Sequence, residues 1–165
     1  LDIVGEGPER APLQTQIREA GLVDRVVLRG RVSGVELGDA YAAADVLALP
    51  SILDSRSDTE GLGVVLLEAM SYGVPVIGSR VGGIPDIIVD GETGLLVAPG
   101  DPAALAAALQ RLAEDRGLAA RLGAAGRAHV RAHFSWDGIV AAWEACYQAS
   151  VTIDPSDAPS RARGP

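Results

Sequence analysis

The sequence predicts an α/β fold, a Rossmann-like, doubly wound parallel sheet with helices on both of its faces. Short apolar segments alternate with longer segments of helical periodicity along most of the chain. The apolar segments are uninterrupted, which is typical of strands buried on both faces of a parallel sheet. Gly and Pro residues separate the two kinds of segment. The expected strands are residues 1–4, 25–29, 45–49, 75–78 and 95–97.

The first part of the chain contains two predicted helices between its strands. Residues 12–20 place Leu13 and Ile17 on one helical face, and Gly21 ends this segment. Ser33 and Glu36 have the spacing of a capping box, which predicts a short helix that runs to about residue 44.

The central part of the chain contains the helix that matters most for function. Residues 61–72 carry an apolar helical pattern, and Gly73 ends it. A polar loop, residues 51–60, precedes this helix. Residues 79–94 are rich in turn-forming residues and enclose a short apolar piece at residues 85–89.

Helices dominate the last part of the chain. Asp101 followed by Pro102 predicts a helix start, with Asp as the N-cap and Pro at the first helical position. A second helix is expected over residues 118–133, and a third begins at Ser135-Trp136. The aromatic side chains of this last helix, Trp136, Trp143 and Tyr147, are expected to contact the core.

The length of 165 residues predicts one domain, over residues 1–150, and residues 151–165 have the composition of a disordered tail. The formal charge of −8 argues against binding to nucleic acid or to an anionic membrane surface. All 14 basic residues are Arg, so the chain has no lysine for a phosphate clamp. The single Cys146 excludes an internal disulfide. No apolar run has the roughly 20 residues that span a bilayer.

Ligands of doubly wound folds lie at the carboxyl ends of the strands, which directs attention to four loops. These loops are residues 5–8, 30–33, 50–63 and 79–84. Gly61 and Gly63 stand at a predicted helix start, where free amides and the helix dipole favour a phosphate.

Two acidic residues flank this predicted phosphate site. Glu60 directly precedes it, and Glu68 follows about 12 Å along the helix, at about 1.5 Å per residue. Carboxylates accept hydrogen bonds from hydroxyl groups, so a sugar, a diphosphate and a ribose in sequence fit this spacing. The residues alone leave an alternative open, in which Glu68 is a solvated helix residue and Glu60 a carboxylate placed for the helix dipole.

The order of several motifs resembles a known enzyme family. Glu60 and Glu68 with the Gly-x-Gly between them are similar to the E-x7-E signature of retaining glycosyltransferases with the GT-B fold, of the family 4 type. The resemblance covers roughly residues 1–150 and implies that the chain is one half of a GT-B fold. The other motifs that carry it are residues 4–8, 27–32, 44–51, 69–77, 82–86, 90–97 and 99–101.

The resemblance assigns a role to each matching position. Glu60 would act as the catalytic residue that contacts the donor sugar's hydroxyl groups, and Glu68 would hold the ribose. The backbone around Arg31 and Val32 would meet the base, and Ser51 would line the same cleft. The donor sugar and diphosphate would lie on Gly61, Leu62, Gly63 and Val64, although the family usually has an aromatic residue where this chain has Leu62.

The implied reaction transfers a sugar from a nucleoside-diphosphate sugar to an acceptor hydroxyl with retention. The resemblance implies no cofactor and no metal, and the sequence has no Asp-x-Asp motif. The acceptor, a glycan or a lipid-linked glycan, would bind an N-terminal domain that this chain lacks. The family's phosphate-binding Arg and Lys would also precede Leu1. We therefore expect a donor-binding half that is inactive alone, in the cytoplasm or peripheral at the inner membrane through the missing domain.

Two other functions stay open at the level of sequence. The chain could be a non-catalytic module that binds a nucleotide sugar or a protein partner, or a nucleotide-sugar epimerase of GT-B type. His129 and His133 have a spacing that can bind zinc, but no third ligand is apparent, and a surface or capping role is expected for them.

Overall fold

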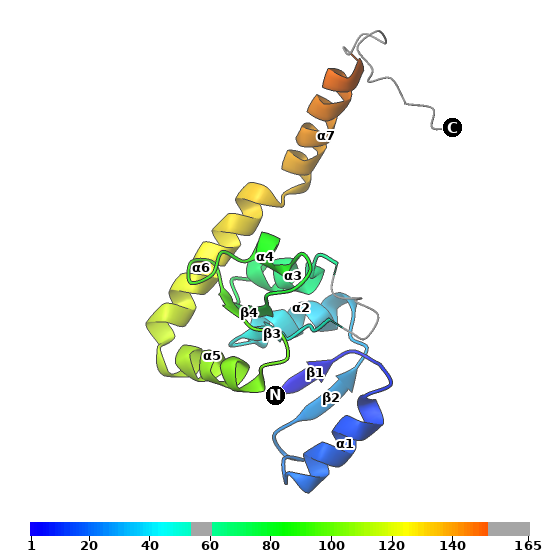
Figure 1. The fold of residues 1–165 in the computed structure, drawn as a ribbon, viewed down its shortest axis with the longest axis vertical. Helices are drawn as coiled ribbons and strands as arrows, with labels where there is room; N and C mark the ends of the chain where they lie inside the picture. Colours follow the sequence, from blue (N-terminus) through cyan, green and yellow to red (C-terminus); the bar gives the residue numbers. More distant parts are fainter. Residues whose placement is uncertain (54–60, 152–165) are drawn as a thin grey trace, which may run out of the picture. The chain divides into compact units, whose positions relative to one another are not determined.

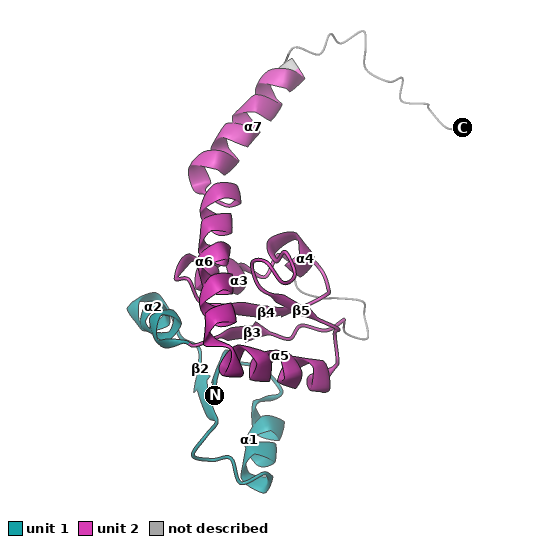
Figure 2. Ribbon diagram, turned by 90° about the vertical axis from the view of Figure 1, so that its left-hand side faces the viewer, with its two compact units in different colours: residues 1–44 teal, residues 45–165 magenta. Residues whose placement is uncertain are grey.

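A computed structural model of the chain describes residues 1–53 and 61–151 (Figure 1). The chain divides into two compact units, Leu1–Ala44 and a second unit that begins at Asp45 (Figure 2). All strand pairs of the described residues are parallel, and they form a two-stranded sheet in unit 1 and a three-stranded sheet in unit 2. No described helix is long and apolar enough to cross a membrane.

Unit 1 is a short β-α-β-α segment. It contains β1 (Asp2–Val4), α1 (Arg10–Glu19), β2 (Val27–Gly30) and α2 (Gly34–Ala43). β1 and β2 lie side by side in parallel, and the amide of Gly5 continues their pairing by donating to the carbonyl of Gly30 over 2.8 Å. Both expected strands and both expected helices of this part are therefore present.

The predicted capping box of α2 is not formed. Ser33 is the N-cap residue and has extended backbone angles, as predicted, but its side chain makes no capping hydrogen bond. The helix therefore begins where the sequence indicated, without the reciprocal side-chain bonds that the spacing of Ser33 and Glu36 suggested.

Unit 2 is built on the sheet β3-β4-β5. Its strands are β3 (Leu47–Leu49), β4 (Val76–Ser79) and β5 (Leu95–Val97), and every residue of the central β4 is buried. The first helices of the unit are α3 (Val64–Ser71) and α4 (Ile84–Ile87), which is a single turn where the sequence indicated only a short apolar piece.

Helices cover both faces of this sheet (Figure 2). On one face, a Cβ atom at Gly78 would meet Ile84, Ile88 and Leu66, so α3 and α4 lie against it. On the other face, Ile77 and β5 share a hydrophobic cluster with α5 (Pro102–Glu114) and α6 (Arg116–His133). Because both faces are covered, β4 is buried throughout and β5 almost so, as the sequence indicated, whereas Ala48 in the middle of β3 is exposed.

Aspartate side chains cap both α5 and α6. The Asp101 carboxylate accepts a 2.9 Å hydrogen bond from the amide of Ala104, and Pro102 opens α5, as predicted. The Asp115 carboxylate accepts a 2.8 Å bond from the amide of Leu118, so α6 begins at Arg116. Each cap satisfies one of the orphan amides of a first helical turn.

The last helix, α7 (Trp136–Val151), corrects one expectation. Trp136 is 81% exposed, Trp143 62% and Tyr147 65%, so these aromatic side chains are not core contacts in this chain. Their spacing does place them on one helical face together with Val140, but no other described element covers that face. A helical apolar pattern indicates a face to be buried and says nothing about which segment buries it.

Candidate functional site at the start of helix α3

The candidate site is the backbone that leads into α3. The helix begins at Val64 rather than at Gly61, because Gly63 adopts left-handed backbone angles, φ 73° and ψ 49°, and serves as the N-cap. Only glycine takes this conformation without a steric penalty. The segment Gly61-Leu62-Gly63 is therefore a bend that brings the backbone up to the helix start.

The floor of this bend is a layer of apolar side chains. A Cβ atom at position 63 would lie 3.2 Å from Leu66, 3.3 Å from Leu49 and 3.4 Å from Ile84. Leu66 and Ile84 are fully buried. The glycine backbone thus rests directly on the core of unit 2, which fixes the height at which the first helical turn starts.

The upper side of the bend is open. Leu62 is 44% exposed and Val64 55%, and no side chain of the described residues caps the helix. Among the described residues, the amides of Gly63, Val64 and Val65 donate no turn or capping hydrogen bond. The first turn of α3 therefore presents unpaired amides at the positive end of the helix dipole, an arrangement that binds anions.

A second turn supports this bend from the side. The amide of Gly83, just before α4, donates a 2.8 Å hydrogen bond to the carbonyl of Gly61. The loop 79–84 was predicted to lie at a strand end, and residues 82–86 are among the motifs of the resemblance, but neither observation assigned a role to Gly83.

The structure describes only one of the two acidic residues of the predicted site. Glu68 lies on α3 and is partly buried, and its backbone carbonyl accepts hydrogen bonds from the Ser71 hydroxyl and the Tyr72 amide. Glu60 lies outside the described residues. Ser51 is partly buried and follows β3 at the carboxyl end of the strand.

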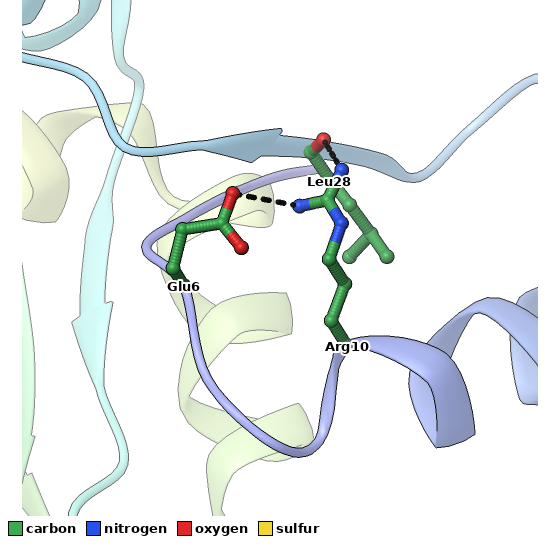
Figure 3. Close-up of polar contacts among 3 residues, drawn as sticks. All are labelled: Glu6, Arg10 and Leu28. Atoms are coloured by element: carbon green, nitrogen blue, oxygen red, sulfur yellow. Dashed lines mark hydrogen bonds and ion pairs between the residues drawn. The ribbon is translucent and has the colours of Figure 1, made fainter.

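Arg31 and Val32, the predicted base contacts, belong to unit 1 and directly follow β2. The segment before them is tied to the loop after β1 (Figure 3). The Arg10 guanidinium donates to the Glu6 carboxylate and to the carbonyl of Leu28, each over 3.4 Å. Glu6 Oε1 also lies 2.6 Å from the place of a Cβ atom at Gly30, so the two loops of unit 1 are closely packed.

His129 and His133 lie next to each other on α6, with ring centroids 4.7 Å apart. Nε2 of His129 is buried and has no hydrogen-bond partner among the residues that the structure describes. Burial, and then the neighbouring His133, lowers the pKa of His129 below its ordinary value of 6.5. Within the described parts of the chain, no three His, Cys, Asp or Glu side chains are grouped so that they could hold a metal ion.

Sequence comparison relates the chain to sugar-transferring enzymes. The family described as "Glycosyl transferases group 1" matches residues 1–129. A GDP-mannose-dependent alpha-(1-6)-phosphatidylinositol monomannoside mannosyltransferase of Mycobacterium tuberculosis is 40% identical over 86% of this chain. An N-acetyl-alpha-D-glucosaminyl L-malate synthase of Bacillus anthracis is 36% identical over 89% of it. The chain spans 37% of the first protein's length and 36% of the second's.

Solved structures confirm the predicted fold class. The sucrose-phosphate synthase of Thermosynechococcus elongatus superposes with a TM-score of 0.77 and is 36% identical in sequence. The matched part covers 92% of this chain and 38% of the synthase chain. Anabaena HepE in complex with UDP matches 91%, and 40% of its own chain, with a TM-score of 0.77 and 26% identity. The C-terminal domain of LpcC, a glycosyl transferase group 1 family protein of Francisella tularensis, matches 77%, and 63% of its own chain, with a TM-score of 0.68 and 29% identity.

Proposed function

This chain belongs to the glycosyl transferases group 1 family, and on that premise we propose that it supplies the donor-binding half of a retaining glycosyltransferase. A nucleoside-diphosphate sugar binds at the carboxyl ends of the strands. An acceptor hydroxyl, held by a part of the enzyme outside this chain, attacks the anomeric carbon of the donor. The bond from that carbon to the diphosphate breaks on the same face, and the acceptor's proton leaves with the nucleoside diphosphate.

The observation that carries this proposal is the open, amide-lined start of α3. The diphosphate gains negative charge as its bond to the sugar breaks, and preorganised amides stabilise charge that develops in a transition state. The backbone amides of Leu62, Gly63 and Val64, at the start of α3, provide such donors without a cationic side chain. This suits a chain whose 14 basic residues include no lysine.

The remaining residues extend the site on either side of the diphosphate. Glu68, on the next turn of α3, accepts hydrogen bonds from the ribose hydroxyl groups, and Glu60 accepts them from the donor sugar. The backbone at Arg31 and Val32 meets the base. Gly61 contacts the donor sugar and diphosphate together with Leu62, Gly63 and Val64, and Ser51 lines the cleft. We propose that no metal ion is needed. The amides at the start of α3, together with cationic side chains outside this chain, stabilise the negative charge of the diphosphate. Action in the cytoplasm, with any contact to the inner membrane made by another domain, stays a prediction.

The names of the relatives support a nucleotide sugar as the donor class. One relative is named as GDP-mannose-dependent, and HepE was solved with UDP and with UDP-glucose. The acceptors that the relatives' names indicate differ from one another, as phosphatidylinositol monomannoside, malate and inositol 3-phosphate do. A shared donor half combined with varied acceptors fits an enzyme in which a different domain chooses the acceptor.

Calorimetric titration of the 165-residue chain with UDP, GDP and ADP and with their sugars tests the proposal. We expect saturable binding for one base. Glu68→Gln should lower the affinity for the ribonucleotide more than the affinity for its 2′-deoxy analogue, because only the ribonucleotide has both ribose hydroxyl groups. Glu60→Gln should lower the affinity for the nucleotide sugar but not the affinity for the free nucleoside diphosphate. Glu19→Gln, an exposed acid on α1, is the matched control.

Two results would contradict the proposal. A folded chain that binds none of these ligands at millimolar concentration would instead favour a non-catalytic interaction module. Equal losses for the ribonucleotide and the 2′-deoxy analogue in Glu68→Gln would remove Glu68 from the ribose site. Stereochemistry is tested on the full-length enzyme, where NMR of the first-formed product should show the anomeric configuration of the donor.

A further inference from the structure

We infer that Gly83 is a positioning residue for the proposed diphosphate-binding amides at the start of α3. It acts through its hydrogen bond to the carbonyl of Gly61. The inference rests on the proposed function, because it concerns the same amides at the start of α3. It adds a residue from a different loop, which no motif of the E-x7-E segment includes.

The contact between the two loops leaves room for glycine alone. The Gly83 amide donates to the Gly61 carbonyl over 2.8 Å. A Cβ atom at position 83 would lie 2.4 Å from that same oxygen and 3.2 Å from the Cα of Leu62. Both are backbone atoms, so no side-chain rotation can relieve the overlap. Gly83 itself has φ −82°, which any residue adopts, so the constraint is one of space and not of backbone strain.

The supporting turn is itself anchored in the core. Val81 is 7% exposed and Ile84 is fully buried, and they stand on either side of the glycine pair. The amide of Ile84 donates to the carbonyl of Val81 over 3.2 Å and closes the turn. Gly83 is therefore a fixed donor, and the loop before α3 is held at a set distance from the end of β4.

This hydrogen bond sets the direction of a neighbouring amide. The peptide unit between Gly61 and Leu62 is planar and trans, as no described peptide bond is cis. Its carbonyl points at Gly83, so its N–H, which belongs to Leu62, points away from the α4 turn. The Leu62 amide is one of the proposed diphosphate donors. Gly83 thus aims this donor without touching the ligand.

Gly83→Ala in the 165-residue chain tests this role. We expect the affinity for UDP or GDP to fall roughly tenfold or more, because a hydrogen bond to a charged group is misaligned. Binding of uridine or guanosine, which have no phosphate, should stay within about twofold. In the absence of ligand, the amide of residue 83 should lose its protection against hydrogen exchange, because its hydrogen bond to the Gly61 carbonyl is disrupted.

Two controls separate positioning from loss of stability. Gly117→Ala makes the same chemical change at an exposed position of α6, outside the four loops at the carboxyl ends of the strands. Ile88→Val removes a methyl group from a buried residue on the same face of the sheet and lowers stability without touching either loop. Both variants should bind the diphosphate as the wild-type chain does, even where the melting temperature of Ile88→Val matches that of Gly83→Ala.

Each remaining outcome decides the matter. The positioning role is wrong if folded Gly83→Ala binds the nucleoside diphosphate with wild-type affinity. It is also wrong if the affinities for the nucleoside and for the nucleoside diphosphate fall by the same factor. If the wild-type chain binds no nucleoside diphosphate, the proposed function fails, and the hydrogen-exchange result alone decides whether Gly83 positions the loop. Unchanged protection of the residue-83 amide would then overturn the inference. If Gly83→Ala does not fold, Ile84→Val, which loosens the same turn, takes its place, and protection of the Gly83 amide is judged by the same criterion.

Discussion

Gly123 of α6 lies directly against the backbone carbonyl of Gly73, the residue that follows the C-cap of α3. A Cβ atom at position 123 would stand 2.1 Å from that oxygen. One turn further along α6, a Cβ atom at Gly126 would lie 3.2 Å from Met70 of α3. The two glycines let α6 approach the end of α3 more closely than any side chain would allow. The helix whose start forms the candidate site is thus fixed at its other end by α6.

We predict that Gly123→Ala lowers the free energy of unfolding by about 1–3 kcal/mol, the usual cost of overpacking. The direction of the change in the free energy of unfolding is informative. Helix propensity alone would make Gly123→Ala more stable by about 1 kcal/mol, because alanine is the better helix former. Urea denaturation followed by circular dichroism measures the change. Gly117→Ala, at an exposed position in the same helix, is the control and should be neutral or stabilising. A Gly123→Ala chain as stable as wild type would show that α6 does not make this close contact.

Gly63→Ala should destabilise the chain for a different reason. The left-handed conformation costs an L residue about 1–2 kcal/mol, and the new Cβ atom would also crowd Leu49, Leu66 and Ile84. Thermal and urea denaturation measure the loss. Gly61→Ala is the matched control, since a Cβ atom there meets none of the described residues within 4 Å and the backbone is not left-handed. Equal stability of the two variants would contradict the strained N-cap.

β4 and β5 could be predicted because burial on both faces favours an apolar pattern. β1 and β2 were recognised by their apolar residues, although Val4 is 46% and Val27 47% exposed. The expected residues 95–97 coincide with β5, and the Asp101-Pro102 start of α5 was visible because its capping bond is local. The start of α3 was placed too early, at Gly61. Glycine occupies helical and left-handed regions alike, so the sequence did not indicate which of the two Gly63 adopts.

The site was predictable only where its parts are close in sequence. The glycines before α3 indicated a helix start, and among the described residues the amides of Gly63, Val64 and Val65 donate no turn or capping hydrogen bond. Binding of an anion there stays a prediction. The bond between Gly83 and Gly61 joins residues from two loops, and pattern analysis does not pair distant loops. The exposure of Trp143 was missed for the same reason, because its periodicity on α7 indicates an apolar face and not its partner.

We predict that Trp143→Ala changes the free energy of unfolding of this chain by less than about 0.5 kcal/mol, as is usual for an exposed residue. Trp143 is 62% exposed and contacts Tyr147 of the same helix, with ring centroids 6.0 Å apart. Leu122→Ala, at a fully buried position of α6, should by contrast cost about 2–5 kcal/mol. Urea denaturation compares them. A large loss for Trp143→Ala would mean that α7 packs its aromatic face within this chain.

The depressed pKa of His129 predicts that stability falls as the pH is lowered. Burial of Nε2 and the nearby His133 disfavour the protonated ring in the folded chain, whereas the unfolded chain protonates near 6.5. The unfolded state therefore binds more protons between the two pKa values, and the contribution present above pH 6.5 is lost as the pH falls through this window. Melting temperatures between about pH 8 and about pH 5 should show a smaller decrease for His129→Gln than for wild type. NMR titration of His133→Gln should place the pKa of His129 above its wild-type value but still below 6.5, because removal of the second ring leaves the burial in place. A wild-type pKa at or above 6.5 would contradict both expectations.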